Sequence, residues 1–518
     1  MLLGDILRRH ALLRPDSPAL LWDDRTWSFR DLRDDSYRLA HALIDAGVAH
    51  QEHVAVLAKN DPGYMTAYFG CAAAGAIITC VNYRLADPEF VYIITDSEAR
   101  LLLLDAEFEP VWERIREQCP NIERVVVFGD APEGYPSYDE FLRDQPAHAP
   151  DRPVSENDVA LQMYTSGTTG VPKGAMLSHR NLVNNAMSSV LGMDLEGARC
   201  FLICAPLYHM AAGICSINSL LSGAPVLLHR EFNPQQVLDD LEGRGVSHTL
   251  FIPAMILFLL QMPDLEKRDF SRLEQIAYGA SPIPYEVLKK AMDAFGCGFL
   301  QAYGQTEATA ILTVLTPEDH RAEGERGERL LKSAGREILG AEVRVVGEDG
   351  RPVKTGEWGE VIARSPGVMK GYWNMPDKTA EAIREGWLWT GDIGYLDDEG
   401  YLYIVDRSKD MIISGGENIY PREIEEVLFG HEAVADAAVI GVPNDKGWGE
   451  EVKACVVRKP DTELDEAAVI AFCRERLAGY KCPKSVDFIE EIPRNLSGKV
   501  LKKDLRAPYW EGHTRAVN

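Results

Sequence analysis

The run Tyr164-Thr-Ser-Gly-Thr-Thr-Gly-Val-Pro-Lys173 concentrates the residue types that bind phosphate groups. Glycine lets the backbone approach a ligand closely, hydroxyl and main-chain N–H groups donate to phosphate oxygens, and lysine adds a mobile positive charge. The spacing is not that of the Walker loop, because Pro172 stands where that motif requires glycine. The run therefore predicts a phosphate cradle of another type. Its candidate ligands are Thr165, Ser166, Gly167, Thr168, Thr169, Gly170 and Lys173.

The alternative for such a run is a surface linker, since Ser, Thr and Gly also favour turns. The flanking residues argue against a linker. Val159–Met163 is mostly apolar and of strand type, and apolar character resumes at Ala175–Leu177. A strand, a phosphate loop and a second strand would place the loop at a sheet edge, where nucleotides bind in α/β proteins.

The size and charge of the chain narrow the class of protein. With 518 residues, 46% hydrophobic and 26% charged, it has an ordinary globular composition and room for two or more domains. The net charge of -26 disfavours nucleic acid as a partner but allows a nucleotide, which needs only a few local cations. The simplest explanation of the negative net charge is that it keeps the protein soluble.

Cysteine usage and the apolar runs indicate the compartment. The ten cysteines include no Cys-x-x-Cys pair, which favours reduced core thiols over a disulfide framework or a zinc site. The N-terminal sequence lacks the pattern of a signal peptide, and no apolar run is long enough to span a bilayer. We therefore expect a cytoplasmic protein without integral membrane association, with a homodimer as a possible assembly.

The pattern of apolar residues predicts the architecture. Helical and strand patterns alternate through residues 1–150 and again through 197–300, a rhythm typical of parallel sheets covered by helices. The predicted helices in the first stretch are Phe29–Ala46 and Pro62–Ala74, and the predicted strands of both stretches are His53–Leu57, Ala76–Val81, Leu101–Leu104, Pro225–Leu228, His248–Ile252 and Gln275–Tyr278.

A change of character follows near residue 335. Short strand patterns such as Glu342–Val346 and Trp358–Ala363 lie between turn signals, which predicts a small β subdomain. Beyond Asp406 the pattern becomes α+β. We predict two domains, 1–406 and 407–518, with the boundary within Asp406–Asp410 and a hinge near Lys409. The predicted elements of the second domain are a helix at Pro421–Phe429, strands at Ala433–Val442 and Glu451–Val457, and a helix at Glu466–Ala478.

Further motifs follow along the chain in a fixed order: Gly279-Ala-Ser-Pro282, Tyr303-Gly-Gln-Thr-Glu307, Trp387-Leu-Trp-Thr-Gly-Asp392, Tyr403–Asp410, Ser414–Glu425 and Pro493–Lys499. In this order they resemble the acyl-adenylating superfamily of acyl-CoA synthetases, standalone adenylation domains and firefly-type luciferases. The resemblance covers nearly the whole chain. It implies a large N-terminal α/β domain of sheets layered with helices plus a β subdomain, followed by a small mobile α+β C-terminal domain.

The resemblance also implies residues for nucleotide binding. Tyr303 would stack on adenine, Thr306 would contact the α-phosphate, and Glu307 would bind Mg²⁺, a hard cation that prefers carboxylate oxygen. Asp392 would accept hydrogen bonds from the ribose hydroxyls with Arg407 beside it, and a carboxylate is suited to both. Standing alone, Glu307 would be explained as a solvated carboxylate after a turn, and the Gly279 segment as an ordinary turn at a strand end. The remaining residues implied for ATP and AMP are Gly279, Ala280, Ser281, Gln301, Ala302, Gly304 and Ile404.

The C-terminal motifs imply a second half-reaction. Gly415 and Gly416 would make room for the pantetheine arm of coenzyme A, and Trp448 would line its tunnel, with a buried packing tryptophan as the alternative. Lys409 matches the hinge position, although an exposed linker lysine fits equally. Lys499 would reach the carboxylate oxygen and the α-phosphate during adenylation.

Pro206-Leu-Tyr-His209 resembles the segment whose histidine lines the acyl pocket; a hydrogen-bonded core histidine is the alternative for His209. The presumed pocket segments are small and uncharged, which favours a medium- or long-chain fatty acid or another apolar monocarboxylic acid. The expected enzyme is an ATP-dependent acyl-CoA synthetase using ATP, Mg²⁺ and coenzyme A. The alternatives are an aryl-CoA ligase, an adenylating enzyme that loads a carrier-protein thiol, and a catalytically dead binding protein.

Overall fold

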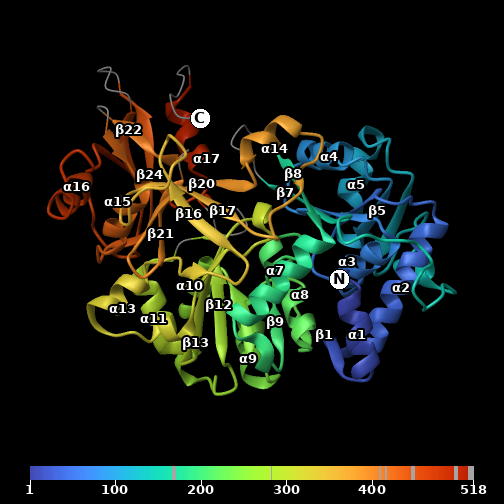
Figure 1. Cartoon of the computed structure of the whole chain (residues 1–518). Coiled ribbons are helices and arrows are strands. Elements are labelled where there is room, and N and C mark those ends of the chain that lie inside the picture. Colours follow the sequence, from blue (N-terminus) through green and yellow to red (C-terminus); the bar gives the residue numbers. More distant parts are fainter. Residues whose placement is uncertain are drawn as a thin grey trace.

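The computed structural model describes residues 1–165, 171–281, 283–407, 410–414, 417–444, 450–494 and 500–511. The predicted fold class is confirmed. Two sheets layered with helices form the large N-terminal part, a β subdomain follows, and a small C-terminal domain, orange to red in Figure 1, lies beside that subdomain. The exact boundary between the two domains stays a prediction.

The first sheet carries the hydroxyl-rich loop. Its centre is parallel, as predicted, but β7 and β8 run antiparallel and are joined directly by residues 166–172. The loop thus connects the second and third strands from the edge of the sheet at which β18 lies. The spatial order is β18 (Gly371–Tyr372), β8 (Lys173–Ser178), β7 (Val159–Thr165), β4 (Ile77–Val81), β3 (His53–Leu57), β5 (Leu101–Asp105) and β6 (Arg124–Phe128).

The second sheet is also parallel at its centre and antiparallel at both ends. The predicted strand His248–Ile252 ends at Phe251, because Ile252 precedes Pro253 and begins a helix there. The spatial order is β15 (Arg336–Glu337), β14 (Thr313–Leu315), β13 (Gly298–Tyr303), β12 (Gln275–Gly279), β11 (His248–Phe251), β9 (Phe201–Ile203), β10 (Val226–Leu228), β1 (Pro18–Trp22) and β2 (Arg25–Ser28).

Two helices, α3 (Pro62–Ala74) and α8 (Met210–Ser222), are buried on nearly all sides, as helices packed among other elements must be. Asp61 caps α3 by accepting a hydrogen bond from the Gly63 N–H, and Gly75 ends it in the left-handed conformation. The other helices of the N-terminal part are α1 (Asp5–Leu13), α2 (Phe29–Asp45), α4 (Asp87–Asp96), α5 (Glu109–Ile115), α6 (Tyr138–Leu142), α7 (His179–Gly192), α9 (Pro234–Gly243), α10 (Pro253–Leu260), α11 (Tyr285–Phe295), α12 (Pro317–His320), α13 (Gly324–Leu330) and α14 (Pro376–Ala382).

The β subdomain is an antiparallel sheet with its own apolar core, as the change of pattern near residue 335 predicted. Strands β20 and β21 form a hairpin that sets Asp392 opposite Arg407. This pairing brings Arg407, two residues before the predicted hinge residue Lys409, to the predicted nucleotide motif. The strands are β16 (Glu342–Val346), β17 (Gly359–Arg364), β20 (Trp387–Leu396), β19 (Ile383–Arg384) and β21 (Leu402–Arg407).

The C-terminal domain packs helices on a small sheet around a separate core. The predicted helix Glu466–Ala478 ends at Arg474, where the turn tightens and the Arg476 N–H donates to the Cys473 carbonyl. The described elements of this domain are β22 (Ile412–Ser414), β23 (Glu417–Ile419), α15 (Pro421–Phe429), β24 (Val434–Pro443), β25 (Glu450–Arg458), α16 (Glu466–Arg474), β26 (Ser485–Phe488) and α17 (Lys502–Arg506).

A few polar contacts join this domain to β21. The Arg422 N–H donates to Asp406 Oδ2 at 3.0 Å, and the Arg422 guanidinium donates to the Ile404 carbonyl at 2.7 Å. Trp358 and Tyr420 add an edge-to-face contact with ring centroids 4.9 Å apart. All ten cysteines are free. Within the described ranges, no helix is both long and apolar enough to cross a membrane.

Candidate active site

A carboxylate and two hydroxyls meet where the two large sheets approach each other. Glu307 lies on a single 3-10 turn after β13, and its side chain is nearly buried. Thr165, the last residue of β7, donates to Glu307 Oε1 at 3.0 Å, and the Tyr372 hydroxyl donates to the same oxygen at 2.9 Å. Among the described residues, no hydrogen bond reaches the second oxygen of Glu307. The carboxylate is thus fixed through one oxygen.

Lys173 begins β8 and lies beside this cluster. Its Nζ is 4.0 Å from the centroid of the Tyr372 ring, a cation–π contact. Burial lowers the pKa of Lys173 below its ordinary value, and the charge of Glu307 only partly opposes that shift. The ammonium group is held by a ring rather than by a direct ion pair with Glu307.

Both ends of the hydroxyl-rich loop are anchored by tyrosines. At the start, the Tyr164 hydroxyl donates to Asp96 Oδ2 at 2.6 Å and accepts from Gln162 at 3.1 Å. At the end, the Tyr92 hydroxyl donates to the Pro172 carbonyl at 3.1 Å. These contacts fix where the loop leaves and re-enters the sheet. The loop residues predicted as ligands that lie outside the described part of the chain are Ser166, Gly167, Thr168, Thr169 and Gly170.

A second polar cluster lies between the end of β13 and the hairpin of β20 and β21. The Tyr303 hydroxyl donates to Asp392 Oδ2 at 2.8 Å, and Arg407 Nε is 3.2 Å from Asp392 Oδ1. Burial, and then the charge of Asp392, raise the pKa of Tyr303 well above its ordinary value. Burial by itself would lower the pKa of Arg407, but the charge of Asp392 outweighs it and the pKa is raised. The carboxylate therefore holds a neutral phenol and a cation at once.

The strand ends between these clusters allow very close backbone approach. A Cβ at Gly279 would lie 2.3 Å from the Ala302 carbonyl oxygen, and one at Gly304 would lie 1.9 Å from the Ala310 carbonyl oxygen. Ala280 has a φ of 65°, in the left-handed region that few non-glycine residues adopt. Such local strain is typical of functional sites.

The remaining residues predicted for the nucleotide lie on the same elements. Gln301 and Ala302 are on β13, Thr306 starts the 3-10 turn, and Ile404 is on β21. The Ser281 hydroxyl is buried and has no hydrogen-bond partner within the described residues, which a bound ligand would remedy. The structure thus brings together the described residues predicted for the nucleotide. The other predicted residues, Lys409, Gly415, Gly416, Trp448 and Lys499, lie outside the described residues.

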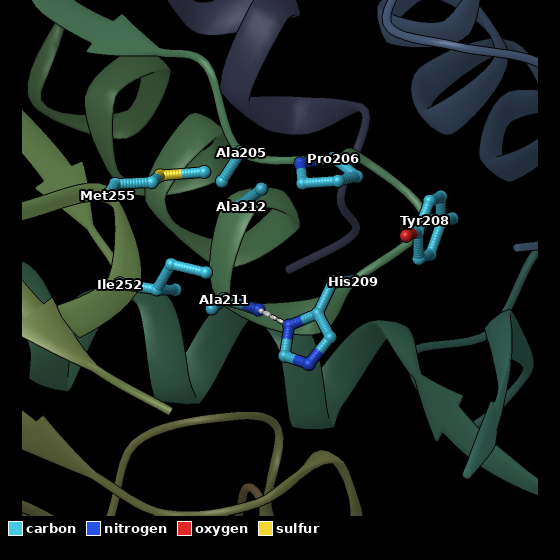
Figure 2. A pocket seen from close by; sticks show the side chains of 8 residues that line it. All are labelled: Ala205, Pro206, Tyr208, His209, Ala211, Ala212, Ile252 and Met255. Atoms are coloured by element: carbon cyan, nitrogen blue, oxygen red, sulfur yellow. Dashed lines mark hydrogen bonds between the residues drawn. The ribbon is translucent and has the colours of Figure 1, made fainter. Parts of the chain in front are cut away.

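An apolar pocket opens beside His209 (Figure 2). His209 caps α8: its Nδ1 accepts the Ala211 N–H at 3.3 Å, and burial lowers the pKa of its imidazole. His209 is therefore both hydrogen-bonded and exposed to the pocket. It combines features of the two alternatives, a pocket-lining histidine and a hydrogen-bonded core histidine. The cavity itself is small, about 20 Å³, and no lining residue is charged; the lining is Ala205, Pro206, Tyr208, His209, Ala211, Ala212, Ile252 and Met255.

Sequence reasoning missed Tyr372, which contacts both Glu307 and Lys173. It follows a glycine in a two-residue edge strand, and nothing in its local spacing marks it. Its partners are separated from it by 65 and about 200 positions along the chain. Only the pairing of β18 with β8 brings them together.

Comparison with known proteins identifies the family. The sequence profile of the AMP-binding enzyme family matches residues 7–373, and the profile of the AMP-binding enzyme C-terminal domain matches residues 423–499. The chain belongs to the AMP-binding enzyme family. As a member it is an AMP-forming acid–thiol ligase, and the expected cofactors, ATP, Mg²⁺ and coenzyme A, are those of the family.

Relatives of this family resemble the chain over nearly its full length. A fatty acid–acyl-carrier-protein ligase, ScoC, from Streptomyces coeruleorubidus is 38% identical over 98% of this chain and 96% of its own length. A feruloyl-CoA synthase from an Amycolatopsis species is 39% identical, covering 97% and 98%. A crystal structure of the anthranilate CoA ligase AuaEII with anthranoyl-AMP superposes with a TM-score of 0.90 at 29% identity, covering 98% and 97%.

The described residues fit a magnesium ion held mainly by substrate. Glu307 offers a hard carboxylate ligand whose geometry Thr165 and Tyr372 already fix through one oxygen. Within the described ranges, no group of three or more His, Cys, Asp or Glu residues could form a protein cage for a metal. Mg²⁺ usually takes one or two carboxylates beside substrate phosphates and water, so a single Glu suits it.

Proposed function

We propose that this enzyme activates an uncharged, apolar monocarboxylic acid, a medium- or long-chain fatty acid or an aryl acid, and transfers it to coenzyme A. The observation that carries the proposal is the pocket beside His209, which contains no charged side chain. An amino acid or a second carboxylate on the substrate would leave a charge without a partner there, and such burial is costly.

The first half-reaction is adenylation. One carboxylate oxygen of the acid attacks the α-phosphorus of ATP, the bond from that phosphorus to the bridging oxygen breaks, and pyrophosphate leaves with the electron pair. Displacement at phosphorus depends mostly on positioning and on stabilising negative charge. Mg²⁺ held by Glu307 would neutralise phosphate charge. Thr306, Lys173 and the loop beginning at Thr165 would orient the phosphates, with Lys499 bridging the carboxylate oxygen and the α-phosphate.

The second polar cluster would bind the ribose and the adenine of ATP. Asp392 already accepts a hydrogen bond from Tyr303 and pairs with Arg407, so it has the geometry of an acceptor for hydroxyl groups. Adenine would stack on the face of the Tyr303 ring. The Ser281 hydroxyl and the closely packed backbone of Gly279 and Gly304 would line the base.

The second half-reaction is thioester formation. The thiolate of coenzyme A attacks the acyl carbon, the bond from that carbon to the phosphate oxygen breaks, and AMP leaves. The thiol proton passes to solvent. A hinge at Lys409 would swing the C-terminal domain, withdrawing Lys499 and bringing Gly415, Gly416 and Trp448 to the pocket, as in hinged domain closure.

A carrier-protein thiol is the second candidate acceptor. It is supported by the similarity to ScoC, whose name gives an acyl-carrier protein as its partner. The feruloyl and anthranilate relatives support coenzyme A and an aryl acid instead. A homodimer and a cytoplasmic location remain predictions.

The test is pyrophosphate release with ATP and Mg²⁺ across fatty, aryl, dicarboxylic and amino acids, with and without coenzyme A. We expect turnover with an apolar monocarboxylic acid that requires coenzyme A and yields AMP. A burst of pyrophosphate that stalls in the presence of coenzyme A would assign the carrier-protein thiol. Turnover mainly with an amino acid or a dicarboxylic acid would refute the proposed substrate class.

The division of labour between the half-reactions has its own test. Lys499→Ala should abolish most pyrophosphate release while leaving conversion of supplied acyl-AMP to acyl-CoA largely intact. Lys503→Ala, a change at an exposed lysine on α17, is the matched control. Equal loss of both half-reactions in Lys499→Ala would contradict the assignment.

A further inference from the structure

We infer that Asn60 is a positioning residue that holds the loop carrying His209 in place and thereby shapes the acid pocket. This inference rests on the proposed function of that pocket. Asn60 lies three residues after β3, in the first sheet, and its side chain is buried, with 1% of its surface exposed. It lines none of the pocket itself, so its effect on the acid would pass through the loop.

The amide of Asn60 spans the gap between the two large sheets. Its Nδ2 donates to the Ala205 carbonyl at 3.0 Å and to the His229 carbonyl at 2.9 Å. Its Oδ1 accepts the Leu207 N–H at 2.8 Å. Ala205 follows β9 and His229 follows β10, neighbouring parallel strands of the second sheet. The Asn60 side chain thus connects the carboxyl ends of β3, β9 and β10.

This set of partners requires a primary amide. The amide offers two donors and an acceptor at one distance from the backbone, and here both donors and the acceptor are used. An ionised aspartate cannot donate, a serine has a single donor, and the reversed amide would set its oxygen against two carbonyl oxygens. The bonds therefore fix the orientation of the group as well as its identity.

The loop at 204–209 depends on these bonds. It connects β9 to α8 and supplies four of the pocket-lining residues, Ala205, Pro206, Tyr208 and His209 (Figure 2). Its backbone polar groups at Ala205 and Leu207 bond side chains, in place of the backbone partners that a neighbouring strand would supply. The Leu207 carbonyl accepts from the Tyr68 hydroxyl at 2.5 Å. Buried backbone groups need such partners, so loss of Asn60 would release the loop into other arrangements.

The nucleotide-binding residues do not share this support. Tyr303 and Glu307 stand on and after β13, Asp392 on β20 and Lys173 on β8, and Asn60 bonds none of them. Loss of Asn60 should therefore weaken use of the acid and leave use of ATP nearly unchanged. A residue with a purely structural function would lower stability without this split.

The test compares Asn60→Ala with Asn121→Ala in the full-length enzyme. Asn121 is the matched control because its Nδ2 also donates to two carbonyls, those of Ile94 and Ala99, at 2.9 and 2.7 Å, away from the pocket. Tyr68→Phe serves as a second variant, because it removes the bond to Leu207 but keeps the ring. The probes are dodecanoate, hexadecanoate and ferulate, with KM measured for the best of them and for ATP.

We expect Asn60→Ala to raise KM for the acid about tenfold while KM for ATP changes less than about twofold. Tyr68→Phe should change the acid KM in the same direction, and Asn121→Ala should leave it unaltered even where urea unfolding shows equal destabilisation. An unchanged acid KM in both Asn60→Ala and Tyr68→Phe, or a parallel rise in both substrates, would overturn the inference.

A spectroscopic reading separates this inference from the proposed function. With histidines labelled by ¹³C and ¹⁵N, the His209 signals, assigned by comparison with His209→Gln, should shift or broaden in Asn60→Ala and stay in place in Asn121→Ala. If the wild type uses no acid in the panel but the His209 signals move, the proposed function fails and the positioning stands. If the wild type is active and those signals stay unmoved, the positioning fails.

Discussion

The proposed nucleotide side of the active site consists mainly of charged and hydroxyl groups that already bond one another, whereas the proposed acid side consists of alkyl groups, the Tyr208 phenol and the His209 imidazole. On the nucleotide side, Asp392 holds Tyr303 and Arg407, and Glu307 holds Thr165 and Tyr372. On the acid side, small residues such as Ala211 and Ala212 leave space. The first region can discriminate mainly by directional bonds and the second mainly by size and shape.

The energies of the two kinds of contact differ in the same way. Removing one partner of a fully buried charged pair costs on the order of 3–5 kcal/mol, and less where one partner is partly exposed, as Arg407 is. Filling or emptying an apolar pocket by one methylene changes binding by about 1–3 kcal/mol. Substitutions should therefore be more damaging, and less selective among acids, on the nucleotide side.

Asp392→Asn should have the largest effect. The amide can still accept a hydrogen bond, but it removes the negative charge that pairs with the Arg407 guanidinium and that would bind the ribose hydroxyls, so we expect kcat/KM for ATP to fall about 100-fold. Asp397→Asn is the control, because Asp397 caps the nearby hairpin turn by accepting the Glu399 and Tyr401 N–H groups. Steady-state pyrophosphate release at varied ATP measures both. An equal loss in the control would point to folding instead.

Ala212→Leu should come next and should act on one side only. The larger side chain extends from α8 into the pocket, so kcat/KM for hexadecanoate or ferulate should fall about 20-fold, while KM for ATP stays the same. Butyrate, measured on the same variant, is the internal control because it does not reach so far. If long and short acids lost activity equally, the pocket beside His209 would not be the acid site.

Tyr372→Phe should have a smaller effect on the nucleotide side. It removes one hydrogen bond to Glu307 and keeps the ring against Lys173, so the Mg²⁺ concentration for half-maximal pyrophosphate release should rise about fivefold. Tyr401→Phe removes a similar buried bond, from a tyrosine hydroxyl to Asp319 at 2.5 Å, and should leave the Mg²⁺ dependence alone. A shift in both variants would assign the effect to stability.

The smallest predicted effect is on stability and concerns Asp61, next to Asn60. Burial, and then the charge of Asp105, outweigh the Gly63 hydrogen bond and raise the pKa of Asp61 to about 6. Between its unfolded value near 4 and this value, the folded state binds more protons, so the free energy of unfolding falls as pH rises through that window. Because the carboxyl is partly exposed, the loss should be about 1 kcal/mol.

Asp61→Asn should remove that slope while still capping α3, since asparagine is as good an N-cap as aspartate. Urea unfolding of both proteins at pH 4.5 and 7 measures it. Activity with ATP and acid at pH 7 serves as the control and should not change. The same pH slope in the variant as in the wild type would assign the pH dependence to other carboxyls.

Sequence reasoning succeeded where residues are close in the chain and their types are restrictive. The alternation of patterns predicted the cores of β3, α3, β16 and α15, and the ordered motifs predicted the family. It could not find Tyr372 or Asn60. Tyr372 acts across two sheets on residues far away in the chain, and Asn60, placed before Asp61 and Pro62, has only the pattern of a helix start.

The substrate was the hardest feature to predict for a physical reason. A phosphate or ribose contact needs a particular side chain, which leaves a pattern in the sequence. An apolar pocket is defined by volume that side chains leave empty, and the same small residues can line a cavity or close against a bulky neighbour elsewhere. The pocket of Ala205, Ala212 and Met255 became visible only in three dimensions.

The bond between the Arg422 amide and Asp406 crosses from the last strand of the β subdomain to the first helix of the C-terminal domain. A swing of that domain about the intervening segment would expose this amide to solvent. The rate at which this amide exchanges with deuterium therefore reports the fraction of time that the enzyme spends in this arrangement. Because the amide lies outside both halves of the proposed active site, its exchange can be measured during turnover without altering any group that touches a substrate.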